Sequence, residues 1–295
     1  MGNRWYLGTG EQSDIVVSTR IRLARNISEY PFPNKLNTKS RIELNNIIKD
    51  AMEKDNKYDL RFVEMKTLAR FEAASMAERH IISPEFASDD NGRAFMISKD
   101  EDICIMLNEE DHIRLQVMKS GFALDEAYAI ADEIDDVIGG KLNYAFDERI
   151  GYLTQCPTNL GTGMRASVML HLPALSKKGA MQRLSTTVAK LGLTLRGSYG
   201  EGSEVSGDIY QLSNQVTLGI SEEAAIKNLN SIALQIIAQE KQARALLIKD
   251  EDYLDRIYRS YCILKSAYKL TSKELMNLIS YVRVGVSEGI LDIPA

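Results

Sequence analysis

The stretch DIVVSTRIR at residues 14–22 decides how we interpret the rest of the chain. The β-branched residues of 14–21 predict a strand, in which successive side chains point to opposite faces. Arg20 and Arg22 are therefore expected on one face and Ile21 on the other. Two neighbouring guanidinium groups suit phosphate, because their planar donors bind its oxygens in pairs and keep their charge. Alone, the pair favours a solvent-exposed strand face, because two nearby arginines are common on protein surfaces.

The remaining pattern mixes strand-like and helical runs. Apolar residues recur at helical spacing within residues 127–138 and 181–191, and each run stops at glycine. The last quarter is helical, with a long helix around residues 226–237 and a capping box at 271–274 before another helix. Further strands are expected at residues 60–65, 93–98, 103–107 and 193–196. Strands without strict helix alternation predict an α+β fold, with a largely antiparallel sheet flanked by helices and a helical C-terminal region.

The composition restricts the class of function. The chain has 295 residues, with 36 Lys+Arg against 41 Asp+Glu and 44% hydrophobic residues. This acidic balance argues against nucleic acid as a partner, and no apolar run approaches the roughly 18 residues of a membrane span. Three cysteines and three histidines lack metal-ligand spacing, so no metal site is expected. The first residues lack an apolar signal core, and we expect a cytoplasmic protein.

Three consecutive carboxylates, Glu109, Glu110 and Asp111, directly follow the apolar run 103–107. Like charges this close repel, so a cationic substrate, a magnesium ion or both would stabilise them. An exposed acidic turn is the alternative interpretation. His112, the next residue, is expected to be structural rather than a catalytic base.

Two glycine-containing loops are further candidates. In CPTNLGTGMR at 156–165, spaced glycines let backbone amides approach an anion, although the pattern is neither a P-loop nor a Rossmann fingerprint. Cys156 precedes a proline near arginines, which favours a low-pKa thiolate, while a buried small apolar residue is the alternative. In RGSYGEGSE at 196–204, small residues around Glu201 are compatible with a lid loop that closes over a substrate, but this stretch alone favours a plain glycine-rich hairpin.

In this order, the four segments resemble the catalytic domain of the guanidino (phosphagen) kinases, the creatine and arginine kinases, and more closely their bacterial branch, the protein-arginine kinases. NEEDHIR at 108–114 and CPTNLGTGMRASV at 156–168 are its most specific motifs. The resemblance implies a guanidino-kinase-type catalytic domain at 14–244 and a helical C-terminal region at 245–295. The charged run KDED at 249–252 is the nearest break in the pattern.

The resemblance also implies roles for individual residues. Glu110 matches the catalytic carboxylate, Glu201 a lid-loop carboxylate that holds the guanidinium, and Cys156 the thiol beside it. Glu109 is expected to bind substrate together with Glu110 and Glu201. The implied ATP-binding positions, which include phosphate-clamping arginines and a nucleotide-contacting histidine, are Ser18, Thr19, Arg20, Ile21, Arg22, His80, Arg114, Arg165, Ala166, Ser167, Val168, Met169, Arg196, Gly197, Ser198, Tyr199, Gly200 and Glu201.

The implied reaction is transfer of the ATP γ-phosphate to arginine side chains of proteins, with Mg²⁺ held mainly through the nucleotide phosphates. Creatine and arginine kinases carry a small helical domain whose loop closes over a free substrate, whereas only 13 residues precede the strand at 14–21 here. We therefore expect a site that accepts arginine presented by another protein. Phosphagen kinases usually have aspartate at the position of Gln211, and the bacterial branch resembles this chain there rather than the phosphagen kinases. The bacterial kinases end in an arginine-rich segment, which the sequence up to Ala295 does not contain, so regulation through that segment is not expected to carry over.

Two alternatives remain: a kinase for free arginine, and a catalytically weak adaptor that binds phosphoarginine. The presence of Glu110, Glu201 and all five arginines weighs against the adaptor. The resemblance further implies a stress-response role in which proteins with exposed arginines are marked for Clp-type proteolysis. The expected partners are those protein substrates, an activator protein and the Clp machinery, and a homodimer is left open.

Overall fold

The computed structural model describes residues 4–53, 55–197 and 205–293. Among these residues, eight strands form one sheet in the order β2-β3-β4-β5-β1-β8-β10-β9, with every neighbouring pair antiparallel. The strands are β1 (Val16–Arg25), β2 (Arg61–Glu64), β3 (Ala94–Ile97), β4 (Ile103–Leu107), β5 (Ile113–Ser120), β8 (Met164–His171), β9 (Leu193–Gly197) and β10 (Ile209–Asn214), and β6 (Phe146–Asp147) pairs separately with β7 (Gly151–Tyr152). The predicted largely antiparallel α+β fold is confirmed.

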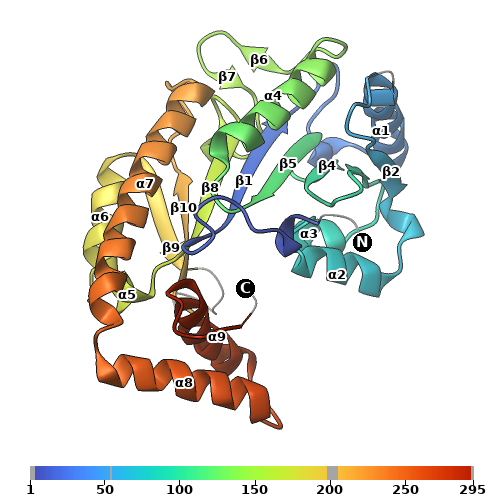
Figure 1. The fold of residues 1–295 in the computed structure, drawn as a ribbon. Coiled ribbons are helices and arrows are strands. Elements are labelled where there is room, and N and C mark those ends of the chain that lie inside the picture. The colour runs from blue at the N-terminus through green and yellow to red at the C-terminus, as the bar shows by residue number, and fades with distance from the viewer. Residues whose placement is uncertain (1–3, 54, 198–204, 294–295) are drawn as a thin grey trace.

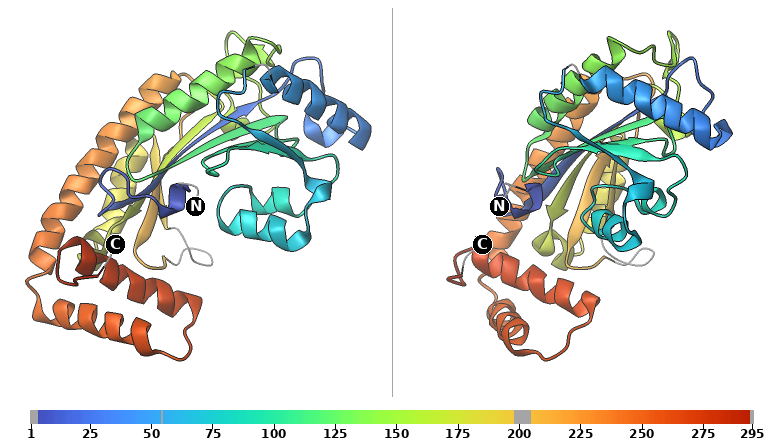
Figure 2. Two further views of the ribbon diagram at one scale, coloured as in Figure 1. Left: turned by 45° about the vertical axis from the view of Figure 1, so that its right-hand side comes forward. Right: turned by 90° about the vertical axis from the view of Figure 1, so that its right-hand side faces the viewer.

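Helices cover the two faces of the sheet unequally. Figure 2 shows the long helices α4 (Leu124–Gly139) and α7 (Glu222–Leu247) along one face, while α2 (Arg70–Glu78) and α3 (Pro84–Ala87) lie on the other side. The other helices are α1 (Thr38–Glu53), α5 (Pro173–Lys177), α6 (Met181–Lys190), α8 (Glu251–Ser266) and α9 (Ser272–Ser287), with 3₁₀ turns η1 (Trp5–Leu7), η2 (Pro33–Lys35), η3 (Met65–Thr67) and η4 (Pro157–Asn159). None of the described helices is long and apolar enough to cross a membrane.

The main core lies between the sheet and the long helices. Ile21 and Leu23 of β1 are fully buried in it, together with Ile134 of α4 and Ile236 of α7. A smaller cluster fills the opposite face at one end of the sheet, where Phe86 packs with residues of α2, β3 and β4. The rest of that opposite face carries polar side chains, and the candidate site lies there.

The expected strands correspond to β1, β2, β3, β4 and β9, but the sequence pattern does not predict β5, β8 and β10. Each of these three strands places polar side chains on the site face, as in IRLQVMKS of β5 and MRASVMLH of β8. Polar residues at alternate positions dilute the β-branched and apolar signal that marks a buried strand. Among the strands that carry site residues, β1 is therefore predicted by its β-branched run, whereas β5, β8 and β10 are not.

The helical C-terminal region contacts the sheet domain through α9 (Figure 1). Ser280 of α9 lies 2.9 Å from His171 Nε2 of β8 and donates to Asp208 at 2.8 Å. The charged run 249–252 falls where expected, because α7 ends at Leu247 and α8 begins at Glu251, with Asp250 as its N-cap. The division into domains 14–244 and 245–295 stays a prediction.

Candidate active site

The register of the sheet collects the five predicted arginines on one face. Side chains opposite one another on neighbouring antiparallel strands point to the same side, and so do residues two apart on one strand. Arg22 of β1 lies opposite Arg165 of β8, which puts two guanidinium groups side by side. The remaining pairs that extend this face are Arg20–Ser167, Ala24–Arg114, Met169–Gln211 and Gln211–Arg196. The prediction that Arg20 and Arg22 share a face opposite Ile21 is confirmed.

A polar cavity of about 170 Å³ lies on this face, and we call it the transfer cavity. Segments far apart in the sequence meet there, since the strands β1, β5 and β8 each contribute an arginine and two loops contribute acids and a thiol. The residues that line it include Arg22, Glu109, Glu110, Asp111, Arg114, Cys156, Thr158, Asn159 and Arg165. The structure therefore brings together three of the predicted arginines, the predicted catalytic carboxylate and the predicted thiol.

The arginines of this cavity are crowded. Burial lowers the pKa of Arg22 well below its usual value, and the charges of Arg20, Arg114 and Arg165 lower it further, with Glu109 opposing. The Nε atom of Arg22 is buried and has no hydrogen-bond partner among the described residues. Burial also lowers the pKa of Arg165, with repulsion from Arg196 and Arg114. A polyanion in this cavity would relieve the repulsion and supply the missing acceptor.

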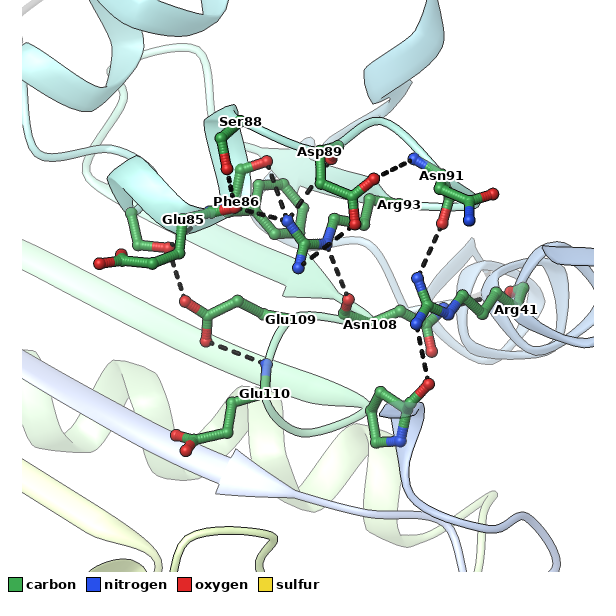
Figure 3. A network of polar contacts seen from close by, with 12 residues as sticks. Arg41, Glu85, Phe86, Ser88, Asp89, Asn91, Arg93, Asn108, Glu109 and Glu110 are labelled. Atoms are coloured by element: carbon green, nitrogen blue, oxygen red, sulfur yellow. Dashed lines mark hydrogen bonds and ion pairs between the residues drawn. The ribbon is translucent and has the colours of Figure 1, made fainter. Parts of the chain in front are cut away.

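Glu109 and Glu110 are neighbours at the end of β4 (Figure 3), and their pKa values shift in opposite directions. Burial alone would raise the pKa of Glu109, but the charge and hydrogen bond of Arg114 and a 2.5 Å hydrogen bond from Ser83 lower it overall. The pKa of Glu110 is raised, mainly by burial and further by the charges of Asp111 and Glu109. Arg114 and Cys156 lower it in part. Glu110 is thus the better proton acceptor of the two. Because Arg114 and Ser83 occupy the Glu109 oxygens, substrate binding by Glu109 stays a prediction.

The Cys156 loop is tied to the acidic turn by Asp111. The buried Asp111 Oδ1 accepts hydrogen bonds from Asn26 Nδ2 at 2.6 Å and from the backbone N–H of Gln155 at 2.8 Å. Cys156 follows directly, with its Sγ 3.1 Å from Thr158 Oγ1, and its thiol lowers the pKa of Glu110. The thiol and the raised-pKa carboxylate are thereby held side by side at the edge of the transfer cavity.

A second cavity of about 360 Å³ lies beside Arg20, and its size falls within the range of ligand pockets. We call it the base cavity, because its aromatic and thioether side chains suit a flat heterocycle and its hydroxyls and Gln211 suit polar groups. It is lined by Trp5, Val17, Ser18, Arg20, His80, Met118, Ser167, Met169, Gly197 and Gln211. Burial lowers the pKa of the half-buried His80, with Arg20 adding to the effect, so this imidazole is neutral near pH 7.

Trp5 is a site residue that the sequence pattern does not predict. Its indole lines the base cavity, and its Nε1 is buried without a hydrogen-bond partner among the described residues. It lies in a short 3₁₀ turn far from every motif, so periodicity gives no signal for it. The only hint in the sequence is that it is the single tryptophan of the chain.

Several expected ATP-binding side chains do not face the cavities. Ile21, Ala166 and Val168 are fully buried in the core under the long helices, because they alternate with the cavity-facing residues of β1 and β8. Thr19 also faces inward, where its hydroxyl donates to Gly121 O at 2.7 Å and accepts from Ala123 N–H at 3.1 Å. Strand alternation keeps these side chains out of the two cavities, and the assignment of these positions to ATP binding stays a prediction.

The other predictions for the site concern the stretch 196–201 and His112. Arg196 is exposed on the arginine face but lines neither cavity, and Gly197 lines the base cavity. Ser198, Tyr199, Gly200 and Glu201 lie outside the described residues. His112 is structural, as expected: it is fully buried, its Nδ1 accepts from Ile27 N–H at 3.0 Å, and its Nε2 lies 2.9 Å from Pro31 O.

Comparisons with known proteins agree with this geometry. Residues 43–243 match the family model for the ATP:guanido phosphotransferase C-terminal catalytic domain, and residues 250–294 match the protein-arginine kinase McsB C-terminal domain. The protein-arginine kinase of Halothermothrix orenii is 45% identical over 98% of this chain and 83% of its own length. That of Clostridium acetobutylicum is 47% identical over 98% of this chain and 86% of its own.

Solved structures give the same result. The duplicated taurocyamine kinase of Schistosoma mansoni with bound transition-state analogue components superposes with a TM-score of 0.70 at 27% identity, over 88% of this chain and 40% of that one. A lombricine kinase gives a TM-score of 0.69 at 25% identity, over 81% of this chain and 69% of that one. The chain therefore belongs to the ATP:guanido phosphotransferase family, in the branch whose curated members are protein-arginine kinases.

Proposed function

We propose that this chain transfers the γ-phosphoryl group of ATP to the guanidino group of arginine side chains in proteins. The observation that carries the proposal is the transfer cavity, in which Glu110, Cys156 and an arginine cluster meet beside a nucleotide-sized cavity. The relatives named protein-arginine kinase, 45% and 47% identical over nearly the whole chain, support the protein substrate.

The nucleotide would extend from the base cavity into the transfer cavity along β1. Arg20 borders the first cavity and Arg22 the second, and residues two apart on a strand are about 7 Å apart, a spacing that suits a polyphosphate. Phosphoryl transfer has a loose transition state, so catalysis consists mainly of alignment and charge stabilisation. The cross-strand pair Arg22 and Arg165 would supply both at the transferred group.

The described part of the chain offers no dedicated metal cage for Mg²⁺. Among residues 4–53, 55–197 and 205–293, no group of three or more His, Cys, Asp or Glu side chains could hold a metal ion. We therefore propose that Mg²⁺ is held mainly by the ATP phosphates and water, where it would neutralise part of their charge. The arginine face would bind the remaining anionic oxygens.

Glu110 would accept the proton of the attacking nitrogen. The guanidinium pKa of about 13.8 lies far above that of any carboxylate, so complete deprotonation before attack would be strongly uphill. The proton therefore moves as the Nη–P bond forms and the bond between Pγ and the β,γ-bridging oxygen breaks. The raised pKa of Glu110 makes it a stronger base than an ordinary glutamate, although its contact with Cys156 and Arg114 limits the shift.

Two further residues would orient the acceptor. Cys156, beside Glu110, would contact the guanidinium edge. Glu201 lies outside the described residues, and its role as a second carboxylate that fixes the guanidinium plane rests on the family resemblance.

Product analysis tests this proposal directly. The chain is incubated with ATP, Mg²⁺ and a mixture of unfolded proteins, and phosphosites are mapped by mass spectrometry under non-acidic conditions, because the P–N bond is acid-labile. We expect phosphoarginine, no turnover of free L-arginine at matched concentration, and loss of the signal with Glu110→Gln. Phosphate found only on hydroxyl residues, or on free arginine in preference to protein, would overturn the proposal.

We also propose that this activity marks proteins for Clp-type proteolysis during stress, with an activator protein and a homodimer as further elements. These proposals rest on the family resemblance alone. Degradation of a phosphorylated against an unphosphorylated substrate by Clp protease tests the first, and sedimentation of the chain alone and with candidate activators tests the others. Equal degradation rates would remove the proteolytic role.

A further inference from the structure

A third cavity adjoins the transfer cavity, and we call it the flanking cavity. It measures about 480 Å³ and shares Glu109, Glu110 and Arg114 with the transfer cavity. Its other lining residues are Asn34, Arg41, Glu85, Arg93 and Gln155, none of which has a role in the reaction described above. Because Glu110 borders both cavities, the part of the substrate next to the reacting guanidinium would face the flanking cavity.

Asn108 fixes two arginines of this cavity to the catalytic turn (Figure 3). Arg93 Nε donates to Asn108 O at 3.2 Å, and Asn108 Nδ2 donates to Arg41 O at 3.2 Å. Asn108 itself is fully buried at the end of β4, with a left-handed φ of 60° that turns the chain into Glu109 and Glu110. Asn108 therefore holds the Arg93 guanidinium and the backbone of Arg41 in a defined position relative to Glu110.

Most of the hydrogen bonds that these two guanidinium groups donate go to neutral backbone carbonyls. Arg41 donates to the carbonyls of Asn91 and Pro33, both at 2.9 Å, and Arg93 donates to the carbonyl of Glu85 at 2.6 Å. The carboxylate paired with Arg93 is Asp89, at 3.7 Å, and no ion pair of Arg41 occurs within the described part of the chain. Burial lowers the pKa of Arg93 and the charge of Arg41 lowers it further, while Asp89 opposes.

A second feature of the cavity is an acceptor without a donor. The Oε1 atom of Gln155 is buried and has no hydrogen-bond partner among the described residues, and Arg41 Nε is likewise buried and unpartnered among them. Glu85 also borders the cavity, but it is exposed, and Figure 3 shows its carboxylate pointing away from Arg93. On the side away from Glu109 and Glu110, the cavity thus offers the Arg41 and Arg93 guanidinium groups and one N–H acceptor.

We propose that the flanking cavity binds a carboxylate of the substrate next to the acceptor guanidinium, between Arg41 and Arg93, while a substrate N–H donates to Gln155. This inference rests on the proposed function, since it assumes that the guanidinium lies at Glu110. The carboxylate has two candidate sources. One is an aspartate or glutamate side chain near the target arginine of a protein, and the other is the α-carboxylate of free arginine.

Matched substrates distinguish these sources. One arm uses peptides with blocked termini and a single arginine. In matched pairs, one of the three positions on either side of the arginine carries either aspartate or asparagine. The other arm compares free arginine with agmatine, which has the same guanidinium without the carboxylate. For the peptides, turnover is measured with ATP and Mg²⁺, and binding is measured separately by fluorescence anisotropy without ATP.

We expect a preference of about tenfold for aspartate at one or more positions, in KM and in binding, because a charge-assisted hydrogen bond contributes that much. Tighter binding of free arginine than of agmatine would instead assign the cavity to the α-carboxylate. Equal binding of all pairs would overturn the inference. If the aspartate peptides bound more tightly than the asparagine peptides but no peptide were phosphorylated, the carboxylate site would stand and the proposed function would be overturned.

Variants of Arg41 separate charge from folding. Arg41→Gln should reduce the aspartate preference towards one, whereas Arg41→Lys keeps the charge and should keep most of the preference. Lys39→Gln, which removes an exposed charge on the same helix, is the matched control and should behave as the wild type. Thermal melts by circular dichroism establish that each variant is folded. A full preference in folded Arg41→Gln would contradict the assignment.

Discussion

The two faces of the central sheet carry opposite chemistry although the same strands build both. Under α4 and α7, Ile21, Val168 and Leu212 are fully buried in an apolar core. On the other face, the residues that alternate with them include Arg22 and Arg165, whose pKa values are lowered by burial and further by the charges of neighbouring arginines. A shift of one residue along a strand therefore separates a core side chain from an arginine of the candidate site. Substitutions on the two faces should accordingly affect different measurable quantities.

The largest expected effect is on the chemical step. Glu110→Gln retains size and hydrogen bonding but cannot take the proton, so kcat should fall by about 10²- to 10⁴-fold while ATP affinity and the free energy of unfolding stay nearly unchanged. Stopped-flow turnover and separate ATP titration measure the two. Glu148→Gln, on the exposed turn between β6 and β7, is the matched control. An unaltered kcat would remove Glu110 from the mechanism.

The covered face should show the reverse pattern. Leu212→Ala removes a fully buried side chain and should lower the free energy of unfolding by about 2–5 kcal/mol, with kcat retained at low temperature where the variant is folded. Leu212→Met, which keeps the volume, should lose less than about 1.5 kcal/mol. Urea unfolding measures both. A Leu212→Ala protein of full stability but reduced kcat would contradict the separation of the two faces.

The arginine face should depend on shape as well as charge. Arg165→Lys keeps the charge but loses the planar fork beside Arg22, so kcat/KM should fall about tenfold to thirtyfold with the stability within about 0.5 kcal/mol. Arg183→Lys, exposed on α6, serves as the control and should be neutral. If Arg165→Lys kept the wild-type kcat/KM, bidentate phosphate binding at this position would be wrong.

Acid should weaken the contact between the end of β8 and the helices α7 and α9, where His171 lies 2.9 Å from Ser280 and 3.1 Å from Arg244. Burial lowers the pKa of His171 well below its usual value, with repulsion from Arg244 and Arg283, so the folded state binds fewer protons than the unfolded state below pH of about 6.5. The free energy of unfolding should therefore fall as the pH drops below that value, by up to about 1.4 kcal/mol per pH unit for this histidine. Urea unfolding between pH 7.5 and 5.5 measures the slope. A stability that rose on acidification would contradict a neutral His171.

The smallest effect is optical. Trp5 is the single tryptophan and lines the base cavity, so ATP should change its fluorescence, whereas inorganic triphosphate should change it much less. Trp5→Phe should weaken ATP binding by only about threefold, because an aromatic ring remains. Identical fluorescence changes with ATP and triphosphate would place the base elsewhere.

The sequence is sufficient to predict the fold class and the site where local patterns carry the signal. The β-branched run of β1 predicts a strand, and alternation then predicts that Arg20 and Arg22 share a face. The three consecutive acids predict a site through their mutual repulsion, and the structure places them in the transfer cavity.

Other features depend on contacts that no local pattern encodes. Trp5 reaches the base cavity through the path of the chain, and Asn108 connects Arg41 with Arg93 through burial. The difference between Glu109 and Glu110 arises from Arg114 and Ser83, which lie elsewhere in the sequence. A family motif covers whole segments, so it also includes Ala166 and Val168, whose side chains lie in the core because a strand alternates between its two faces.

A structure of the chain with ATP and Mg²⁺ tests the central claim most directly. The account predicts the adenine against Trp5 in the base cavity, the phosphates along Arg20, Arg22 and Arg165, and the γ-phosphorus facing Glu110 across the transfer cavity. A nucleotide bound outside these two cavities, or a γ-phosphate directed away from Glu110, would contradict it.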